Sequence, residues 1–262
     1  FDPKMALGLG HARLSILDLS SGAHQPFFSE DKRFVIVFNG EIYNFKSIRQ
    51  DLMDRGYGPF QTQGDTEVLL KAYQADGLAC LSKLNGMFAF AIFDYERNEM
   101  VLARDRMGKK PLYIAQASGT LLFASELKAI LQHPTFKSEL NLNALNQYLT
   151  LDYVPTPITI FEGVEKLEGG HYLQIDFKGN IKRGAFWEPS FIPLEISFEE
   201  AKEELDRLLA EATALRLVAD VPVGIFLSGG LDSSAVAFYA QKQATKPIQT
   251  FSIGFNEKSY DE

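Results

Sequence analysis

The residues best suited to chemistry lie in one short run, Ser-Gly-Gly-Leu-Asp-Ser-Ser, from Ser228 to Ser234. The run follows an apolar segment that ends at Leu227 and precedes a segment with helical character. Adjacent glycines let the backbone turn sharply, and the free N–H groups at the start of the helix then face the gap. Such a turn binds anions through these donors and the helix dipole, and serine hydroxyls add donors for phosphate oxygens. The pattern therefore predicts a phosphate-binding loop.

A plain strand-to-helix turn, with Asp232 as the helix cap, is the alternative interpretation of this run. It is not a Walker A motif, because no Lys follows the glycines. The full run instead resembles the loop of ATP pyrophosphatases, which holds pyrophosphate while ATP adenylates a carboxylate. That resemblance implies ATP and Mg2+ as cofactors, Asp232 near the metal and phosphate, and the backbone of Leu227 and Ile253 beside the adenine. The implied ATP-binding residues are Leu227, Ser228, Gly229, Gly230, Leu231, Asp232, Ser233, Ser234 and Ile253.

Several stretches of the first half carry a second resemblance. In chain order they are Gly10–Ile16, Phe38–Asn44, Gly64–Glu67, Gly86–Asp94, Arg104–Tyr113 and Ala124–Ala129. They resemble the class II (N-terminal-nucleophile) glutaminase domain of asparagine synthetases, and with the loop the resemblance covers essentially the whole chain. It implies an αββα sandwich for this half.

A glutamine pocket must hold an α-carboxylate, an α-ammonium and a side-chain amide. Arg13 offers a planar fork for the carboxylate, and Asp65 offers a counter-charge for the ammonium. The Asn39 side-chain N–H and the Gly40 backbone N–H are candidates for an oxyanion hole over the attacked carbon. Glu41 and the backbone of Leu14, Ser15, Ile16 and Leu17 would complete the pocket. Taken singly, each residue also has a structural interpretation: a salt bridge for Arg13, a hairpin turn for Asn39–Gly40, a helix cap for Asp65.

The nucleophile of class II glutaminases is an N-terminal Cys whose free amine serves as the base. This chain begins with Phe1, and the resemblance implies that some forty residues precede it. Cys80, the single cysteine, lies between apolar residues, so a buried structural thiol is expected there. His11, His24, His133 and His171 show no metal-ligand spacing. We therefore expect that this chain does not hydrolyse glutamine.

For a complete protein, the resemblance implies an ATP-dependent amide ligase of the asparagine synthase type. Ammonia from glutamine would attack a β-aspartyl-AMP intermediate, giving asparagine, AMP, pyrophosphate and glutamate. A β-lactam-synthetase-like ligase is disfavoured because the glutamine ligands are present. Two alternatives stay open: a related amidotransferase that acts on a surface sugar or peptide acid, and a non-catalytic module that binds glutamine or nucleotide. The expected partners are glutamine, aspartate and ATP. The sequence alone determines neither the identity of the acceptor nor the oligomeric state, for which a homodimer is one possibility.

Two kinds of element must position these residues. The segment from Val35 to Tyr43, around Asn39–Gly40, predicts a hairpin. Asp65 predicts the cap of a helix that ends at Gly77. The segment from Met87 to Ala103 predicts two paired strands. Three further strands are expected at 121–124, 171–177 and 181–187, the last two joined by a hairpin turn at 178–180. This half therefore predicts stacked antiparallel sheets flanked by helices.

The second half predicts a helix capped by Ser197, then a parallel strand–loop–helix–strand unit that opens a doubly wound α/β (PP-loop) domain. The apolar stripe of the first helix, from Leu205 to Leu215, indicates core packing. The expected organisation is a glutamine amidotransferase domain over residues 1–187, a linker over 188–196 and a synthetase domain over 197–262, with the first and last parts of the two domains outside the chain.

Composition narrows the functional classes. The content is 46% hydrophobic and 23% charged, as in a soluble globular protein, and the net charge of -8 disfavours broad attraction to nucleic acid or anionic lipid. No apolar run approaches the roughly 20 residues that span a bilayer. With one cysteine, no internal disulfide forms, and a cytoplasmic location is the default.

Overall fold

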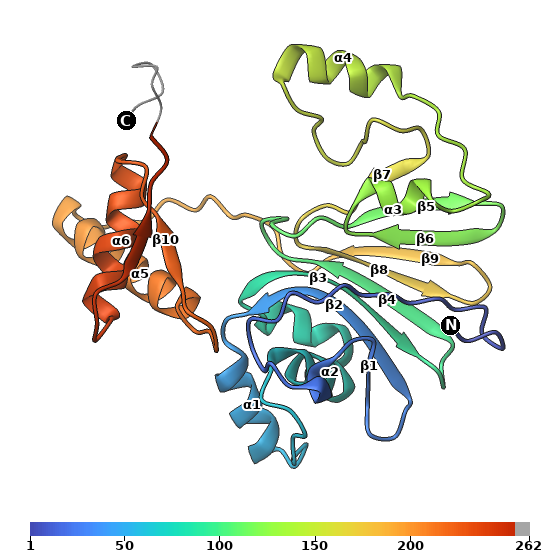
Figure 1. The fold of residues 1–262 in the computed structure, drawn as a ribbon, viewed down its shortest axis with the longest axis horizontal. Helices are drawn as coiled ribbons and strands as arrows, with labels where there is room; N and C mark the ends of the chain where they lie inside the picture. Colours follow the sequence, from blue (N-terminus) through green and yellow to red (C-terminus); the bar gives the residue numbers. More distant parts are fainter. Residues whose placement is uncertain (255–262) are drawn as a thin grey trace. The chain divides into compact units, whose positions relative to one another are not determined.

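The chain forms two compact units in a computed structural model that describes residues 1–254. The first unit holds residues 1–14 and 20–189, and the second holds residues 15–19 and, among the described residues, 190–254. Figure 1 shows their elements. Those of the first unit are η1 (Ser21–Ala23), β1 (Phe27–Phe28), β2 (Phe34–Ile42), α1 (Phe45–Asp54), α2 (Asp65–Asp76), η2 (Gly77–Lys83), β3 (Gly86–Asp94), β4 (Glu99–Arg104), β5 (Tyr113–Ala117), β6 (Thr120–Ala124), α3 (Leu127–Leu131), α4 (Leu142–Leu151), β7 (Val164–Lys166), β8 (His171–Asp176) and β9 (Ile181–Ala185).

The first unit is built on two antiparallel sheets. Six strands pair in the order β1-β2-β3-β4-β8-β9, and three pair in the order β6-β5-β7. Helices α1 and α2 lie on the side of the larger sheet that faces away from the smaller one, and α3 lies beside β6 (Figure 1). The layers are therefore helix, sheet, sheet and helix, which is the expected αββα sandwich.

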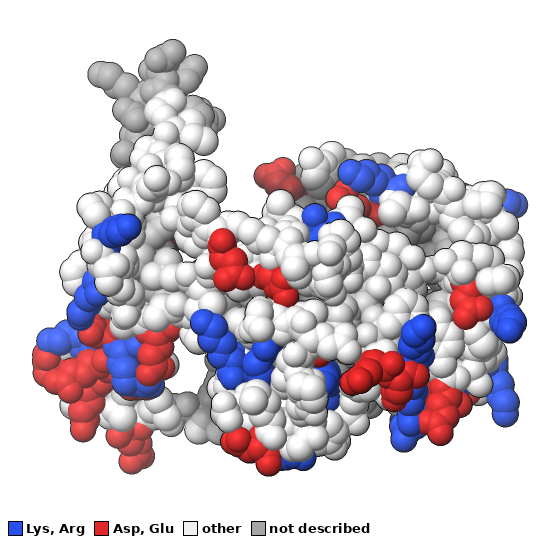
Figure 2. All heavy atoms as spheres, turned by 60° about the horizontal axis from the view of Figure 1, so that its bottom comes forward, with Lys and Arg blue, Asp and Glu red and all other residues white. Residues whose placement is uncertain are grey.

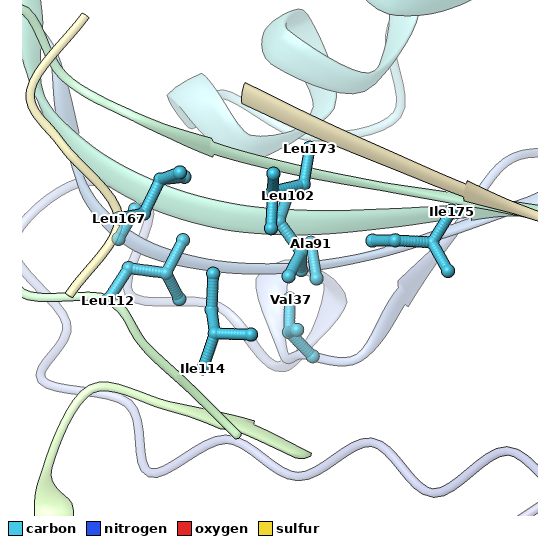
Figure 3. Packing of buried hydrophobic residues seen from close by; sticks show 9 residues of the cluster. Val37, Ala91, Leu102, Leu112, Ile114, Leu167, Leu173 and Ile175 are labelled. Carbon is cyan, nitrogen blue, oxygen red and sulfur yellow. The ribbon is translucent and has the colours of Figure 1, made fainter. Parts of the chain in front are cut away.

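Apolar side chains of both sheets meet in the core of this sandwich (Figure 3). Val37, Ala91 and Leu102 come from the larger sheet, and Leu112 and Ile114 come from the segment that forms the smaller one. Successive strand residues point to opposite faces, so their neighbours Ile36, Phe90 and Ile92 pack on the helical side. Strand β3 is consequently buried on both faces, as its long apolar run predicted.

The hairpin predicted at Asn39–Gly40 is wrong. β2 runs straight through both residues, and its nine positions pair with β3, with Asn39 opposite Ala89 and Gly40 opposite Phe88. The glycine is needed for a different reason than a turn. Gly40 has a φ of +155°, and a Cβ there would lie 2.1 Å from the Met87 carbonyl oxygen. Glycine therefore serves the close approach of two strands.

The predicted helix after Gly64 is present, but Asp65 is not its cap. α2 begins at Asp65, with Gly64 in the cap position and no side-chain capping bond, and Gly77 ends the helix with a φ of +56°. The strand pairs β3–β4 and β8–β9 match the expected hairpins.

The second unit contains α5 (Phe198–Arg216), β10 (Gly224–Phe226), α6 (Leu231–Gln243) and β11 (Gln249–Phe251). Ser197 and Glu200 form the capping box that starts α5. β10 and β11 pair in parallel on either side of α6 in the sequence, as the strand–loop–helix–strand pattern predicted.

The stripe on α5 does not form a core. Leu205, Leu208 and Leu209 are 57%, 48% and 36% exposed, because few described elements of this unit lie against the helix. Acidic and basic side chains lie next to each other over this unit at the left of Figure 2. On α5, Arg207 pairs with Glu204 and Glu211. None of the helices in residues 1–254 combines the length and apolar character needed to cross a membrane.

Candidate functional site

A cavity of about 410 Å³ opens between the two sheets of the first unit. The small side chains Ala89 and Ala91 of β3 leave the space, and Asn39 of β2 lines it directly opposite Ala89. The 10–12 segment and the end of β6 complete the wall. The Asn39 carboxamide Nδ2 donates to Ser125 Oγ at 3.1 Å. The side chain predicted to stabilise an oxyanion therefore faces a space large enough for a small ligand.

The backbone N–H of Gly40 points to the outer edge of the larger sheet. Phe88, its partner on β3, donates its own N–H to Asp105 Oδ2 at 3.1 Å and accepts from the Asp105 N–H at 2.8 Å. In an antiparallel strand, the N–H and C=O of one residue point to the same neighbouring strand. Those of Phe88 point towards β4, so Gly40 and Phe88 form a non-hydrogen-bonded pair. The Gly40 N–H accordingly faces away from β3.

Neighbouring N–H groups on that edge are taken by side chains. The Phe38 N–H donates to Gln25 Oε1 at 2.6 Å, and the Ile42 N–H donates to Asp65 Oδ2 at 2.9 Å. Gly40 lies between these two positions on the strand. The edge thus presents a donor next to a buried carboxylate.

Asp65 is buried, with 7% of its surface exposed. Burial raises the pKa of its carboxyl group to about 6, against the opposing effects of the Ile42, Asp65 and Thr66 backbone N–H groups and of the Arg13 charge. Arg13 therefore lies close enough to act on Asp65 electrostatically. A cationic ligand stabilises a carboxylate that carries such a desolvation penalty. This fits the role expected for Asp65, which is to bind the α-ammonium group of glutamine.

The other predicted pocket residues divide between the units. Glu41 is buried in β2, whereas the Leu14 side chain is 86% exposed. Ser15, Ile16 and Leu17 belong to the second unit, where the Asp220 N–H donates to the Ile16 carbonyl oxygen at 3.0 Å. The backbone contribution of these three residues to a glutamine pocket stays a prediction.

His11 was not predicted to take part in the site. Its side chain lines the cavity, and its Nδ1 atom is shielded from solvent without a hydrogen-bond partner among residues 1–254. Burial lowers the pKa of His11, a hydrogen bond with the Phe38 backbone opposes this shift, and the Arg13 charge adds to it. The sequence feature that could have pointed to His11 is its position two residues before Arg13 in the Gly10–Ile16 stretch.

Other motif residues hold the frame of the site. Glu67 accepts from the N–H of Thr62 at 2.7 Å and from its hydroxyl at 2.7 Å, which fixes the loop before α2. Arg104 donates to the carbonyl oxygens of Lys110 and Gly108 at 2.7 and 2.6 Å. These hydrogen bonds hold the loop before α2 and the segment after β4 in place.

Cys80 lies in η2 with 1% of its surface exposed. Burial raises the pKa of its thiol to about 12, and Asp76 adds to the shift. The expectation of a buried structural thiol is confirmed.

The predicted phosphate loop connects the end of β10 to the start of α6. Gly229 has a φ of +98°, which favours glycine, and Gly230 occupies the cap position of the helix. The hydroxyls of Ser228 and Ser233 are 3.0 Å apart, so they lie on one side of the turn. The free N–H groups at the α6 terminus and these hydroxyls fit the phosphate groups of a nucleotide.

The ends of both parallel strands meet at this loop. The Leu227 N–H donates to the Phe251 carbonyl oxygen at 2.8 Å, and Ser252 Oγ donates to the Leu227 carbonyl oxygen at 2.6 Å. The exposed Ile253 follows directly, so the two residues expected beside an adenine lie at the same edge.

Asp232 is exposed in the first turn of α6. Within residues 1–254, no group of three or more His, Cys, Asp or Glu side chains is arranged to hold a metal ion. Asp232 fits Mg2+ as one carboxylate ligand, with the phosphate oxygens of a nucleotide supplying the others.

Comparison with known families agrees with the geometry of both units. Residues 2–187 match the family described as "Glutamine amidotransferase domain", and residues 204–262 match the family described as "Asparagine synthase". The chain belongs to the glutamine amidotransferase family. Its first match covers the αββα sandwich, and its second covers most of α5 and the phosphate loop.

Curated relatives carry both regions of this glutamine amidotransferase. A protein of Methanocaldococcus jannaschii named putative asparagine synthetase [glutamine-hydrolyzing] 2 is 39% identical, over 98% of this chain and 52% of its own length. Asparagine synthetase [glutamine-hydrolyzing] 1 of Bacillus subtilis is 37% identical, over 98% of this chain and 40% of its own. A Gibberella zeae protein named amidase chry2 is 36% identical, over 94% of this chain and 37% of its own. The chain thus spans about half, or less, of the length of these relatives.

Proposed function

We propose that this chain is part of a glutamine-dependent amide ligase that converts aspartate to asparagine. Glutamine is held in the first unit, with its α-carboxylate on Arg13, its α-ammonium on Asp65 and its side-chain oxygen towards Asn39 and Gly40. The observation that carries this proposal is the succession along β2 of the Asn39 carboxamide, the outward N–H of Gly40 and the Ile42 N–H that is bound by the buried Asp65 carboxylate. The names of the two asparagine synthetase relatives support the choice of reaction.

ATP is the second proposed substrate, and it supplies the activation of the acceptor carboxylate in the complete protein. The loop from Leu227 to Ser234 binds its phosphates through the α6 terminus and the serine hydroxyls. Asp232 holds Mg2+ together with the phosphates, and Leu227 and Ile253 flank the adenine. The strand–loop–helix geometry and the "Asparagine synthase" match over residues 204–262 support this assignment.

The 262-residue chain itself binds glutamine without hydrolysing it. Its single thiol, Cys80, is buried, and the raised pKa of about 12 leaves almost no thiolate at neutral pH. No other Cys is present to serve as the nucleophile. Glutamate release from glutamine at a native-like rate would contradict this part of the proposal.

A different acceptor carboxylate is the second candidate. The relative named amidase chry2 matches over nearly all of this chain although its name is not that of an asparagine synthetase. This name supports an acceptor other than aspartate as the second candidate. Feeding ammonia, ATP and candidate acids to the full-length protein, and measuring AMP release, separates aspartate from other acceptors.

Isothermal titration with L-glutamine and with ATP tests the binding proposals on this chain. We expect one glutamine site that is lost in Arg13→Ala, because one charged hydrogen-bonding partner contributes roughly tenfold to hundredfold in affinity. Arg97→Ala, on the exposed turn between β3 and β4, is the matched control and should bind normally. ATP binding should weaken in Ser233→Ala without any change in glutamine affinity. Absence of glutamine binding by the unaltered chain would overturn the proposal.

A further inference from the structure

Ser125 belongs to the Ala124–Ala129 stretch, whose purpose the glutamine and nucleotide sites do not explain. It follows β6 in the smaller sheet and precedes α3. Its hydroxyl accepts the hydrogen bond from Asn39 Nδ2 at 3.1 Å, across 86 positions of sequence. This contact connects the end of the smaller sheet to β2 of the larger one.

The orientation of the Asn39 carboxamide depends on few contacts besides this hydrogen bond. The cavity wall combines the apolar side chains Val37, Ala89 and Phe123 with polar ones such as His11 and Lys128. In the described part of the chain, Ser125 is the one hydrogen-bonding partner recorded for the Asn39 side chain. An asparagine amide rotates broadly about its last torsion, and its oxygen and nitrogen have similar size. Without the Ser125 hydroxyl, the Asn39 carboxamide would lose the hydrogen bond that fixes the position of its nitrogen.

The bond to Ser125 also leaves one donor for a ligand. Nδ2 carries two N–H groups, and Ser125 takes one of them. The remaining N–H and the outward N–H of Gly40 come from consecutive residues of β2. Stabilisation of developing negative charge depends on donors that are already oriented before the charge appears.

We propose that Ser125 is a positioning residue that orients the Asn39 carboxamide towards the side-chain oxygen of bound glutamine. This inference rests on the proposed glutamine site. Ser125 acts only by orienting Asn39, and it therefore affects only the contact with the side-chain amide of glutamine. The α-carboxylate and α-ammonium contacts, at Arg13 and Asp65, are independent of it.

Isothermal titration of this chain with L-glutamine tests the inference. Ser125→Ala should weaken binding about threefold to tenfold, the usual range for one neutral hydrogen bond. Ser125→Thr should bind within about twofold of the unaltered chain, because the hydroxyl remains. Ser47→Ala, which removes an exposed hydroxyl on α1, is the matched control and should have no effect.

A double-mutant cycle separates positioning from general damage to the pocket. In an Asn39→Ala background, Ser125→Ala should cause no further loss of affinity, because its effect passes through the missing carboxamide. L-norleucine keeps the α-groups of glutamine but lacks the amide, so Ser125→Ala should leave its affinity unchanged. Ser125→Thr and Ser125→Val differ mainly by the hydroxyl, and this pair repeats the comparison if Ser125→Ala lowers the melting temperature.

The outcomes distinguish the two proposals. If the unaltered chain binds glutamine and Ser125→Ala binds equally well, the positioning role is overturned and the glutamine site stands. Equal losses with and without Asn39, or an equal loss for L-norleucine, would also overturn it, because the effect would then be structural. If the unaltered chain binds neither ligand, the proposed function fails and the positioning role fails with it.

Discussion

Protonation of Asp65 should weaken glutamine binding as the pH falls below 6. The pKa of the buried carboxyl group is about 6 in the ligand-free chain, and the α-ammonium of glutamine requires the ionised form. If binding is restricted to that form, the dissociation constant rises by the factor 1 + 10^(pKa − pH), which is about 1.1 at pH 7, about 2 at pH 6 and about 11 at pH 5. We therefore expect about a tenfold loss of affinity between pH 7 and pH 5.

Unfolding does not explain such a loss. The folded chain holds the Asp65 proton more tightly than the unfolded chain does, because the folded pKa is raised from 3.8. The contribution of Asp65 to the free energy of unfolding is therefore most favourable below about pH 4 and declines as the pH rises through about 6. As the pH falls from 7 to 5, protonation of Asp65 therefore makes the free energy of unfolding more favourable to the fold, while it weakens the binding of glutamine.

One neighbouring group, His11, is an alternative cause of a pH effect. His11 has a pKa lowered by burial, and its protonation would add positive charge near Arg13. Asp65→Asn should weaken binding at pH 7 and flatten the profile between pH 5 and pH 7, whereas His11→Gln should leave the slope in place. Asp54→Asn, on an exposed carboxylate at the end of α1, is the control. Isothermal titration at four pH values suffices, and an unchanged slope in Asp65→Asn would refute the reasoning.

Three further predictions concern the frame of the two units. Gly40→Ala should lower the free energy of unfolding in urea by about 3 kcal/mol or more, because its Cβ has no room, whereas Gly10→Ala should change it by well under about 1 kcal/mol. Native Cys80 should react with iodoacetamide at pH 8 roughly a thousandfold more slowly than an unfolded cysteine, since the pKa of about 12 depletes the thiolate, and equal rates would contradict its burial. Ser197→Ala should reduce the helicity of α5 by circular dichroism and cost about 1 kcal/mol, a loss that Glu200→Gln, which keeps part of the capping box, should reproduce only in part.

Local patterns in the sequence predicted the secondary structure of the second unit, but not the exposure of the apolar stripe on α5. The capping box at Ser197, the glycine turn after Leu227 and the parallel pairing of the flanking strands follow from short-range rules of helix and strand formation. The αββα fold of the first unit was implied by the resemblance of its motifs. Its long apolar runs were consistent with strands buried on both faces.

Asn39–Gly40 shows why sequence reasoning failed elsewhere. Asparagine followed by glycine is a strong turn signal, but β3 supplies nine pairing positions that keep β2 extended. The same long-range partner creates the contact at the Met87 carbonyl oxygen that requires glycine. Nothing near Gly40 in the sequence reveals this.

Asp65 and Ser125 illustrate the same limit for the site. Asp65 has the type and position of a helix cap, yet its carboxylate bonds to the Ile42 N–H, 23 positions away. Ser125 reaches Asn39 across the sandwich, so its role depends on how two sheets stack. The sequence predicted the candidate pocket residues by their type, but the contacts that orient them depend on tertiary structure.

A crystal structure of this chain with L-glutamine tests the central claim most directly. We expect the α-ammonium at hydrogen-bonding distance from the Asp65 carboxylate, the α-carboxylate on Arg13 and the side-chain oxygen within about 3 Å of Asn39 Nδ2 and the Gly40 nitrogen. Glutamine bound elsewhere, or bound there with its side-chain amide turned away from Asn39 and Gly40, would contradict it.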